Sequence, residues 1–113
     1  MRNQNIIQKI IKHVDTVTKY TSHITYDEFI INSMMVEACV FNLSQIGELV
    51  NRLDVEYMNM YPSIPWFKIR GLRNRIVHDY EGINFKLIWE IIDEDIKTLR
   101  NMLLKLNELS DNI

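Results

Sequence analysis

Apolar residues recur at helical spacing along most of the chain. In the N-terminal part they form one face of a predicted helix that ends near Tyr20: Ile6, Ile7, Ile10, Ile11, Val14 and Val17. A broader stripe follows the predicted N-cap Asn84 in the C-terminal part: Leu87, Ile88, Ile91, Ile92, Ile96, Leu99, Met102, Leu103 and Leu106. No apolar–polar alternation is long enough to predict a strand, so we expect an all-α fold.

A second, long helix is predicted from Asp27 to about Leu53, after a polar loop over 21–25. Between Phe29 and Gly47 the only charged residue is Glu37. Apolar side chains point in nearly all directions: Phe29, Ile30, Met34, Met35, Cys39, Phe41, Leu43 and Ile46. Interspersed Asn, Ser and Gln residues argue against a membrane span. Such a helix must be covered on most sides, by other helices or by a second copy of the chain, and we expect a homodimer.

Proline and glycine separate the remaining elements. A short helix is predicted over 54–61, before Pro62. Pro65 lies near the first position of a third main helix, from Trp66 to about His78. Because no linker or repeat interrupts the chain, we expect one domain over 1–113. Its predicted architecture is an up-and-down bundle of four main helices plus a short helix.

Composition narrows the function classes. The chain has 113 residues, is 47% hydrophobic and carries a net charge of −2, which suits a folded domain and excludes a globally basic nucleic-acid binder. A single cysteine excludes a disulfide framework and a Cys-based zinc site, and it fits a reducing cytoplasm. Asp93, Glu94 and Asp95 are predicted to point three ways from a helix as a solvated face rather than a metal site. We therefore expect no metal and no other cofactor.

One short segment is nevertheless strongly basic. Lys68, Arg70, Arg73 and Arg75 lie within 66–78, which contains no acidic residue. The rest of the chain carries the other nine Lys and Arg and all fifteen acidic residues. This segment is therefore a local positive patch suited to phosphate. The alternative is that these cations pair with carboxylates of neighbouring helices, and composition favours neither interpretation.

His78 is the candidate titrating residue, since His13 and His23 lie near the first loop and are predicted to be solvated. On a continuous helix Asn74 and His78 share a face, and the amide could orient the imidazole. Arg73 would lie about 140° away from His78, so the two converge only if the helix unwinds or if two chains form one cleft. The alternative is that His78 caps the C-terminus of the helix, which spacing alone favours.

Other candidates have simpler explanations. Cys39 is predicted to lie in the core. Trp66 and Trp89 are predicted to be packing anchors, although an exposed indole could stack on a base. Glu48 could form a structural ion pair with Arg70 or Arg73, or take a catalytic role.

Residues 73–80 read Arg-Asn-Arg-Ile-Val-His-Asp-Tyr. This motif resembles the Arg-Asn-x-x-x-His-x-Tyr signature of the HEPN superfamily, in its HepT-like ribonuclease toxin branch. The flanking segments 45–48 and 61–66 and the last helix with Trp89 are also similar. The resemblance covers about 42–106 closely and the first two helices in pattern only.

The resemblance implies a metal-independent RNase toxin, a helical homodimer whose motif helices meet at the two-fold axis. It also implies a minimal nucleotidyltransferase antitoxin that adds AMP to the motif tyrosine, as in a type VII-like toxin–antitoxin system, and leaves open a larger hetero-oligomer. By position, Arg73 and His78 would be catalytic, Asn74 would position them, and Tyr80 would be modified. Lys68, Arg70 and Arg75 are the candidate RNA phosphate-binding residues.

A non-catalytic alternative uses the same residues. In it, the basic cleft binds a nucleotide or docks the nucleotidyltransferase. The presence of His78 favours the nuclease, because a phosphate clamp needs arginines but no titrating base.

Overall fold

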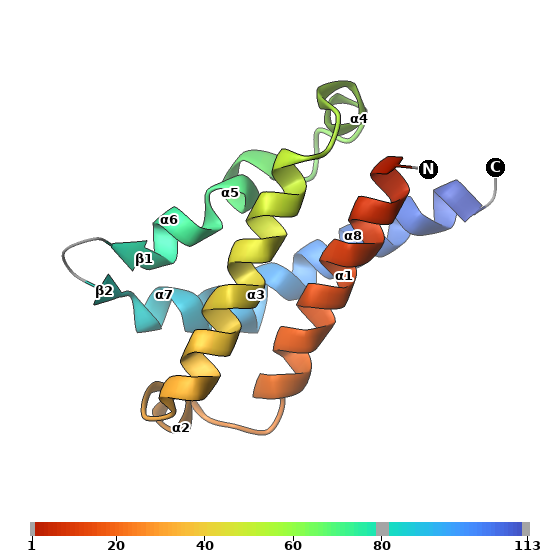
Figure 1. Cartoon of the computed structure of the whole chain (residues 1–113). Coiled ribbons are helices and arrows are strands. Elements are labelled where there is room, and N and C mark those ends of the chain that lie inside the picture. The colour runs from red at the N-terminus through yellow and green to blue at the C-terminus, as the bar shows by residue number, and fades with distance from the viewer. Residues whose placement is uncertain (1, 79–81, 112–113) are drawn as a thin grey trace.

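The computed structural model describes residues 2–78 and 82–111, without the side chains of His78 and of residues 107–111. Helices α1 (Arg2–Thr21) and α3 (Ser33–Asn51) run antiparallel and side by side, and α8 (Ile96–Asp111) packs against α1 (Figure 1). The predicted all-α helical bundle is confirmed. Within the described residues, no helix is long and apolar enough to cross a membrane.

The predicted long second helix is two helices. Thr25 is the N-cap of α2 (Tyr26–Ile30), in a capping box with Glu28, and Asp27 lies in the first turn of this helix. Asn32 then starts α3, because its side-chain oxygen accepts a hydrogen bond from the Met35 amide at 3.0 Å. A side chain that caps a new helix competes with the continuous helical ladder, which explains the break.

The prediction of one continuous third helix over 66–78 is also wrong. After the expected short helix α4 (Val55–Asn59), the chain forms α5 (Trp66–Arg70) and α6 (Leu72–Ile76), which are separated at Gly71. The backbone then becomes extended, and β1 (Val77–His78) pairs antiparallel with β2 (Gly82–Ile83). Gly82 has a φ of 77°, a conformation that glycine adopts without steric cost. Two-residue strands leave no apolar–polar alternation to detect.

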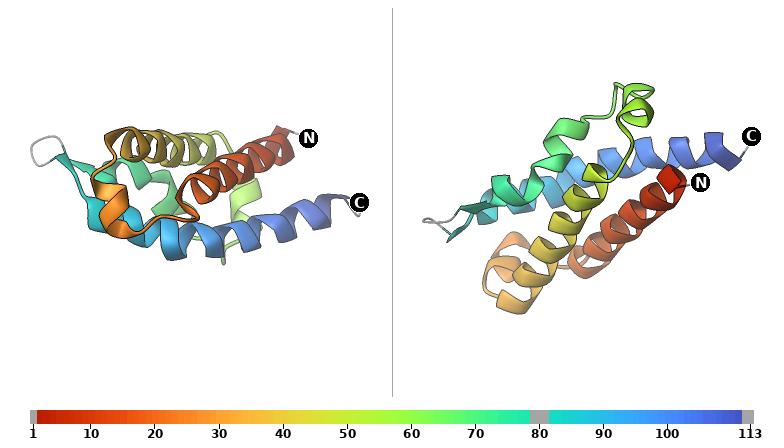
Figure 2. Two further views of the ribbon diagram at one scale, coloured as in Figure 1. Left: turned by 90° about the horizontal axis from the view of Figure 1, so that it is seen from below. Right: turned by 45° about the horizontal axis from the view of Figure 1, so that its top comes forward.

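The last helical segment, from Phe85 to Asp111, is continuous but contains one π-helical turn. Asn84 is the N-cap of α7 (Phe85–Glu90), as predicted, and accepts a hydrogen bond from the Leu87 amide at 3.1 Å. A π-helical turn, η1 (Ile91–Asp95), then leads into α8, and the Ile96 amide donates to the Ile91 carbonyl five residues earlier. The left view of Figure 2 shows this segment, cyan to blue, along one side of the molecule.

The predicted apolar stripes of the first and last helices meet in one core with α3. Cys39 is buried in this core, as predicted, and burial raises the pKa of its thiol to about 11. The interpretation of His13 as solvated is wrong, because its Nδ1 lies 2.8 Å from Oδ1 of the buried Asn42. Since Nδ2 of Asn42 donates to the Ala38 carbonyl, Nδ1 of His13 must donate to the amide oxygen. This hydrogen bond joins α1 to α3.

Gly47 sets the distance between α3 and α5. A Cβ atom there would lie 3.0 Å from the Ile69 carbonyl oxygen and 3.1 Å from that of Arg70, closer than most such contacts allow. We expect Gly47→Ala to lower the free energy of unfolding by about 1–3 kcal/mol, since the helices must move apart. Urea denaturation followed by circular dichroism measures this change.

Gly71→Ala is the matched control. A Cβ atom at Gly71 has its nearest neighbour, the Phe67 carbonyl oxygen, at 3.9 Å, which is an ordinary contact. Gly71 has a φ of −92°, which alanine can also adopt, so the substitution meets neither a steric clash nor a forbidden backbone conformation. Equal stabilities of the two variants would show that the close approach at Gly47 is not a constraint.

Candidate active site

Trp66 anchors the beginning of the basic segment. Its indole Nε1 donates to the carbonyl oxygens of Met58 and Tyr61, at 3.1 Å each, and the ring is buried. The prediction that Trp66 is a packing anchor is confirmed. Trp89 is half-buried and packs on Phe29, with ring centroids 5.2 Å apart. Because Trp66 holds α5 from one side and α3 contacts it at Gly47, the segment that follows has a fixed position.

The four predicted basic residues do not form one cluster. Lys68 and Arg75 line a common groove, whereas Arg73 is exposed on α6 beside the exposed Asn74. Arg70 lies elsewhere, with its guanidinium Nη2 3.9 Å from the Met58 sulfur. Lys68 lies on α5 and Arg75 on α6, and both helices border the groove. Residues two apart on one helix point in different directions, so Arg70 and Arg73 do not face the groove with them.

The alternative that these cations pair with neighbouring carboxylates finds no support among the described side chains. Three ion pairs occur there, and each lies outside the basic segment: Arg2–Asp54, Asp93–Lys97 and Asp15–Arg100. Glu48 is exposed and forms no ion pair with Arg70 or Arg73. The positive charges of 66–76 are therefore available to a ligand as far as the described residues are concerned.

The backbone at His78 differs from the expected helix. Helix α6 ends at Ile76, so Asn74 and His78 do not share a helical face, and His78 does not lie in a last helical turn. The chain unwinds before His78, which removes the 140° separation that a continuous helix would impose between Arg73 and His78. The Asn84 amide donates to the Ile76 carbonyl at 2.9 Å and so ties this junction to the start of α7. Asp79 and Tyr80 lie outside the described residues.

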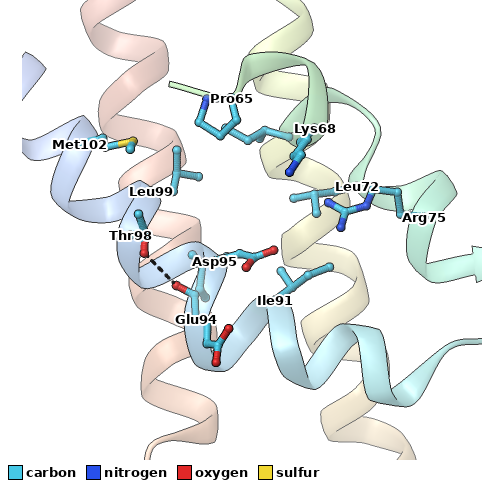
Figure 3. A pocket seen from close by; sticks show the side chains of 12 residues that line it. Pro65, Lys68, Leu72, Arg75, Ile91, Glu94, Asp95, Thr98, Leu99 and Met102 are labelled. Atoms are coloured by element: carbon cyan, nitrogen blue, oxygen red, sulfur yellow. Dashed lines mark hydrogen bonds between the residues drawn. The ribbon is translucent and has the colours of Figure 1, made fainter. Parts of the chain in front are cut away.

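The groove between α5–α6 and η1–α8 has a volume of about 300 Å³ (Figure 3). Its apolar lining comes from both sides: Ile69, Leu72, Ile91, Ile96, Leu99 and Met102. Lys68 and Arg75 lie on one wall, and Glu94, Asp95 and Thr98 lie on the other. Sequence reasoning missed this groove, since nothing in the pattern indicates that the acidic run lies opposite the basic segment.

The acidic run 93–95 is solvent-exposed, as predicted, but its members have different neighbours. Asp93 pairs with Lys97 at 3.6 Å, while Glu94 and Asp95 line the groove. In the part of the chain that the structure describes, no group of His, Cys, Asp and Glu side chains could hold a metal ion.

The chain is similar to known proteins over most of its length. Residues 10–106 match the family described as Ribonuclease HepT-like. A Methanocaldococcus jannaschii protein named "Putative RNase MJ1380" is 34% identical over 91 residues, which cover 80% of this chain and 84% of the relative. Another protein from the same organism, "Putative RNase MJ0127", is 30% identical over 107 residues, which cover 91% of this chain and 88% of the relative.

A more distant relative carries the family name itself. The protein named "Probable ribonuclease HepT" of Thermococcus cleftensis is 23% identical over 106 residues, which cover 94% of this chain and 96% of the relative. No solved structure matches the chain. Because the family match extends over residues 10–106, the chain belongs to the HepT-like ribonuclease family.

Proposed function

We propose that this chain is an endoribonuclease that cleaves single-stranded RNA without a metal ion. The observation that carries the proposal is the junction at Ile76, where a helix with exposed Arg73 and Asn74 gives way to the strand that contains His78. Membership of the HepT-like ribonuclease family and the names of the relatives support the same activity.

The proposed chemistry needs no cofactor. The 2′-hydroxyl of a ribose attacks the adjacent phosphorus, so one group must remove its proton and another must protonate the leaving 5′-oxygen. Two imidazoles, His78 from each of two subunits, could share these roles, since histidine titrates near neutral pH. Arg73 would stabilise the additional negative charge on the phosphate, and Asn74 would position the reacting groups.

The experiment that tests this activity is the incubation of purified protein with single-stranded RNA in EDTA. We expect cleavage products that end in 2′,3′-cyclic phosphate. A non-catalytic nucleotide-binding or docking subunit would bind RNA or nucleotide and leave it intact.

We also propose a symmetric homodimer with the active site at its interface. Met34 and Phe41 are seven residues apart on one face of α3 and are 80% and 59% exposed. Ile31, just before α3, is 82% exposed. Within one chain, α3 therefore retains an apolar surface that a second copy would cover, as the composition of this helix suggests.

Light scattering after gel filtration should give twice the 13.5 kDa mass of one chain at micromolar concentration. The double variant Met34→Glu, Phe41→Glu should shift the protein to monomer, because charges would be buried at the interface. Val55→Glu is the matched control, since Val55 is an exposed apolar residue on α4. A monomeric wild-type protein would contradict the dimer.

The proposed control of this activity is AMPylation of Tyr80 by a cognate minimal nucleotidyltransferase, in a type VII-like toxin–antitoxin system. The sequence motif supports this role, because Tyr80 follows His78 by two residues. An attached AMP would add bulk and negative charge close to the proposed RNA phosphate. The reducing cytoplasm is the proposed setting, in keeping with a single buried cysteine.

A further inference from the structure

The groove between α5–α6 and η1–α8 has opposite charges on its two walls. Lys68 and Arg75 face Glu94 and Asp95 across an apolar floor, and no ion pair among the described side chains joins the walls. Figure 3 shows the Asp95 carboxylate turned toward the wall of Lys68 and Arg75, whereas Glu94 lies lower in the view. A ligand complementary to this groove has an anionic part, a hydrogen-bond donor group and an apolar surface.

We propose that the groove binds one guanine nucleotide of the RNA substrate. This inference rests on the proposed ribonuclease function and adds a base-selective subsite to it. Lys68 and Arg75 contact the phosphate, the base lies on the apolar floor near Leu72 and Leu99, and Asp95 accepts hydrogen bonds from the base edge.

The dimensions and lining of the groove favour a single nucleotide. Its volume of about 300 Å³ lies at the lower end of the range for small-ligand pockets. Leucine, isoleucine and methionine side chains offer a contact surface for the face of a base. Two cations on one wall provide charge-assisted hydrogen bonds for one phosphate.

The carboxylate selects guanine among the four bases. Guanine presents two adjacent N–H donors, N1 and N2, which one carboxylate can accept together. Adenine and cytosine each place a ring-nitrogen acceptor beside the amino donor, and this acceptor would repel the carboxylate. Uracil offers a single N–H between two carbonyl oxygens. Asp95 therefore discriminates by the number of hydrogen bonds that it can form.

The groove lies close enough to the proposed active site to bind the same RNA strand. Arg73 and Arg75 belong to the same five-residue helix α6, and Arg73 is exposed while Arg75 lines the groove. The diameter of a helix with its side chains is about 10–12 Å, so a short oligonucleotide can contact both sides of α6. The π-helical turn that ends at Asp95 is a local irregularity of a kind that is frequent at functional sites.

Binding of short RNAs tests the proposal. The probes are fluorescein-labelled oligouridylates that carry one central guanosine, inosine or adenosine, and the protein is His78→Ala, which is expected to cleave them only slowly. We expect the guanosine probe to bind roughly 5–100-fold more tightly than the adenosine probe by fluorescence anisotropy, as for other bidentate base contacts. The inosine probe, which lacks the N2 donor, should bind with intermediate affinity.

Three substitutions in this background identify the responsible groups. Asp95→Asn should remove most of the preference for guanosine, while Lys68→Gln should weaken binding of all probes and reduce its dependence on salt. Asp93→Asn is the matched control, because Asp93 is adjacent in sequence, pairs with Lys97 and does not line the groove. It should leave the preference unchanged.

The outcomes separate the two proposals. If wild-type protein cleaves RNA but all probes bind equally, the ribonuclease proposal stands and the guanine subsite is wrong. If no RNA is bound or cleaved, the ribonuclease proposal fails, and calorimetric titration with guanosine and adenosine 3′-monophosphates still tests the groove. Equal or absent binding of both nucleotides would overturn the subsite. If Asp95→Asn alters binding of a partner protein and leaves base preference unchanged, the groove is a protein-docking site, which also overturns it.

Discussion

Replacement of His78 with alanine should lower the rate of RNA cleavage by roughly 10²–10⁴-fold, the usual effect of removing one acid–base group. Arg73→Ala should also abolish most activity, because the guanidinium no longer stabilises the charge that develops on the phosphate. Both rates are measured in EDTA with a labelled single-stranded RNA. Thermal denaturation of each variant verifies that its fold is intact.

Matched substitutions at other sites serve as controls. His23→Ala removes an exposed histidine of the loop after α1, and Arg52→Ala removes an exposed arginine at the end of α3. Both variants should retain wild-type activity. Full activity in a pure His78→Ala preparation would refute the assignment of His78.

Mixed dimers distinguish a shared site from two separate ones. If each subunit supplies a different group to one cleft, heterodimers of His78→Ala with Arg73→Ala should regain part of the activity. An absence of rescue in verified heterodimers would favour sites that each lie within one chain.

Tyr80→Phe should retain much of the RNase activity but escape silencing by the proposed nucleotidyltransferase partner. A phenol is neutral near pH 7, since its reference pKa is about 10, so its loss changes the charge of the site little. Each attached AMP adds a phosphodiester charge that competes with RNA for the arginine donors. We therefore expect the variant to be more toxic than the wild type when the two proteins are co-expressed.

Intact-mass spectrometry after co-expression measures the modification directly. The wild-type mass should increase by multiples of AMP, and the increase should be absent in Tyr80→Phe. Tyr20→Phe is the control, because Tyr20 is an exposed tyrosine on α1 and should leave the increase unchanged. An unmodified yet inactive wild-type protein would show that control is steric and that the role assigned to Tyr80 is wrong.

The sequence by itself determined the helical class and most helix positions, because these depend on local properties. The three- and four-residue spacing of Ile6 to Val17 predicts a helix with one buried face, and this face is buried in the structure. Asn84 could be identified as an N-cap because its side chain accepts a hydrogen bond from the first turn of the helix that it begins. The motif from Arg73 to Tyr80 likewise identified the family, since it depends on residue types at short spacing.

Breaks within helical stretches were harder to predict. Asn32 divides the second helix and Gly71 divides the third, although apolar spacing continues through both positions. The extended backbone at Val77 depends on its pairing with Ile83. The spacing of apolar residues does not indicate this pairing. Helical periodicity reports which face is buried, but it does not report which of two competing sets of backbone hydrogen bonds forms.

Only the tertiary structure decided how the charged residues are grouped. Lys68 and Arg75 lie together because α5 and α6 place them on the same side, while Arg70 and Arg73 point elsewhere. Asp95 lies opposite them because the end of η1 forms the other wall of the groove, twenty residues after Arg75 in the chain. The approach of α3 and α5 at Gly47 and the hydrogen bond between His13 and Asn42 are also contacts between distant segments. Such groupings depend on how helices pack, and packing is a property of the whole chain rather than of local spacing.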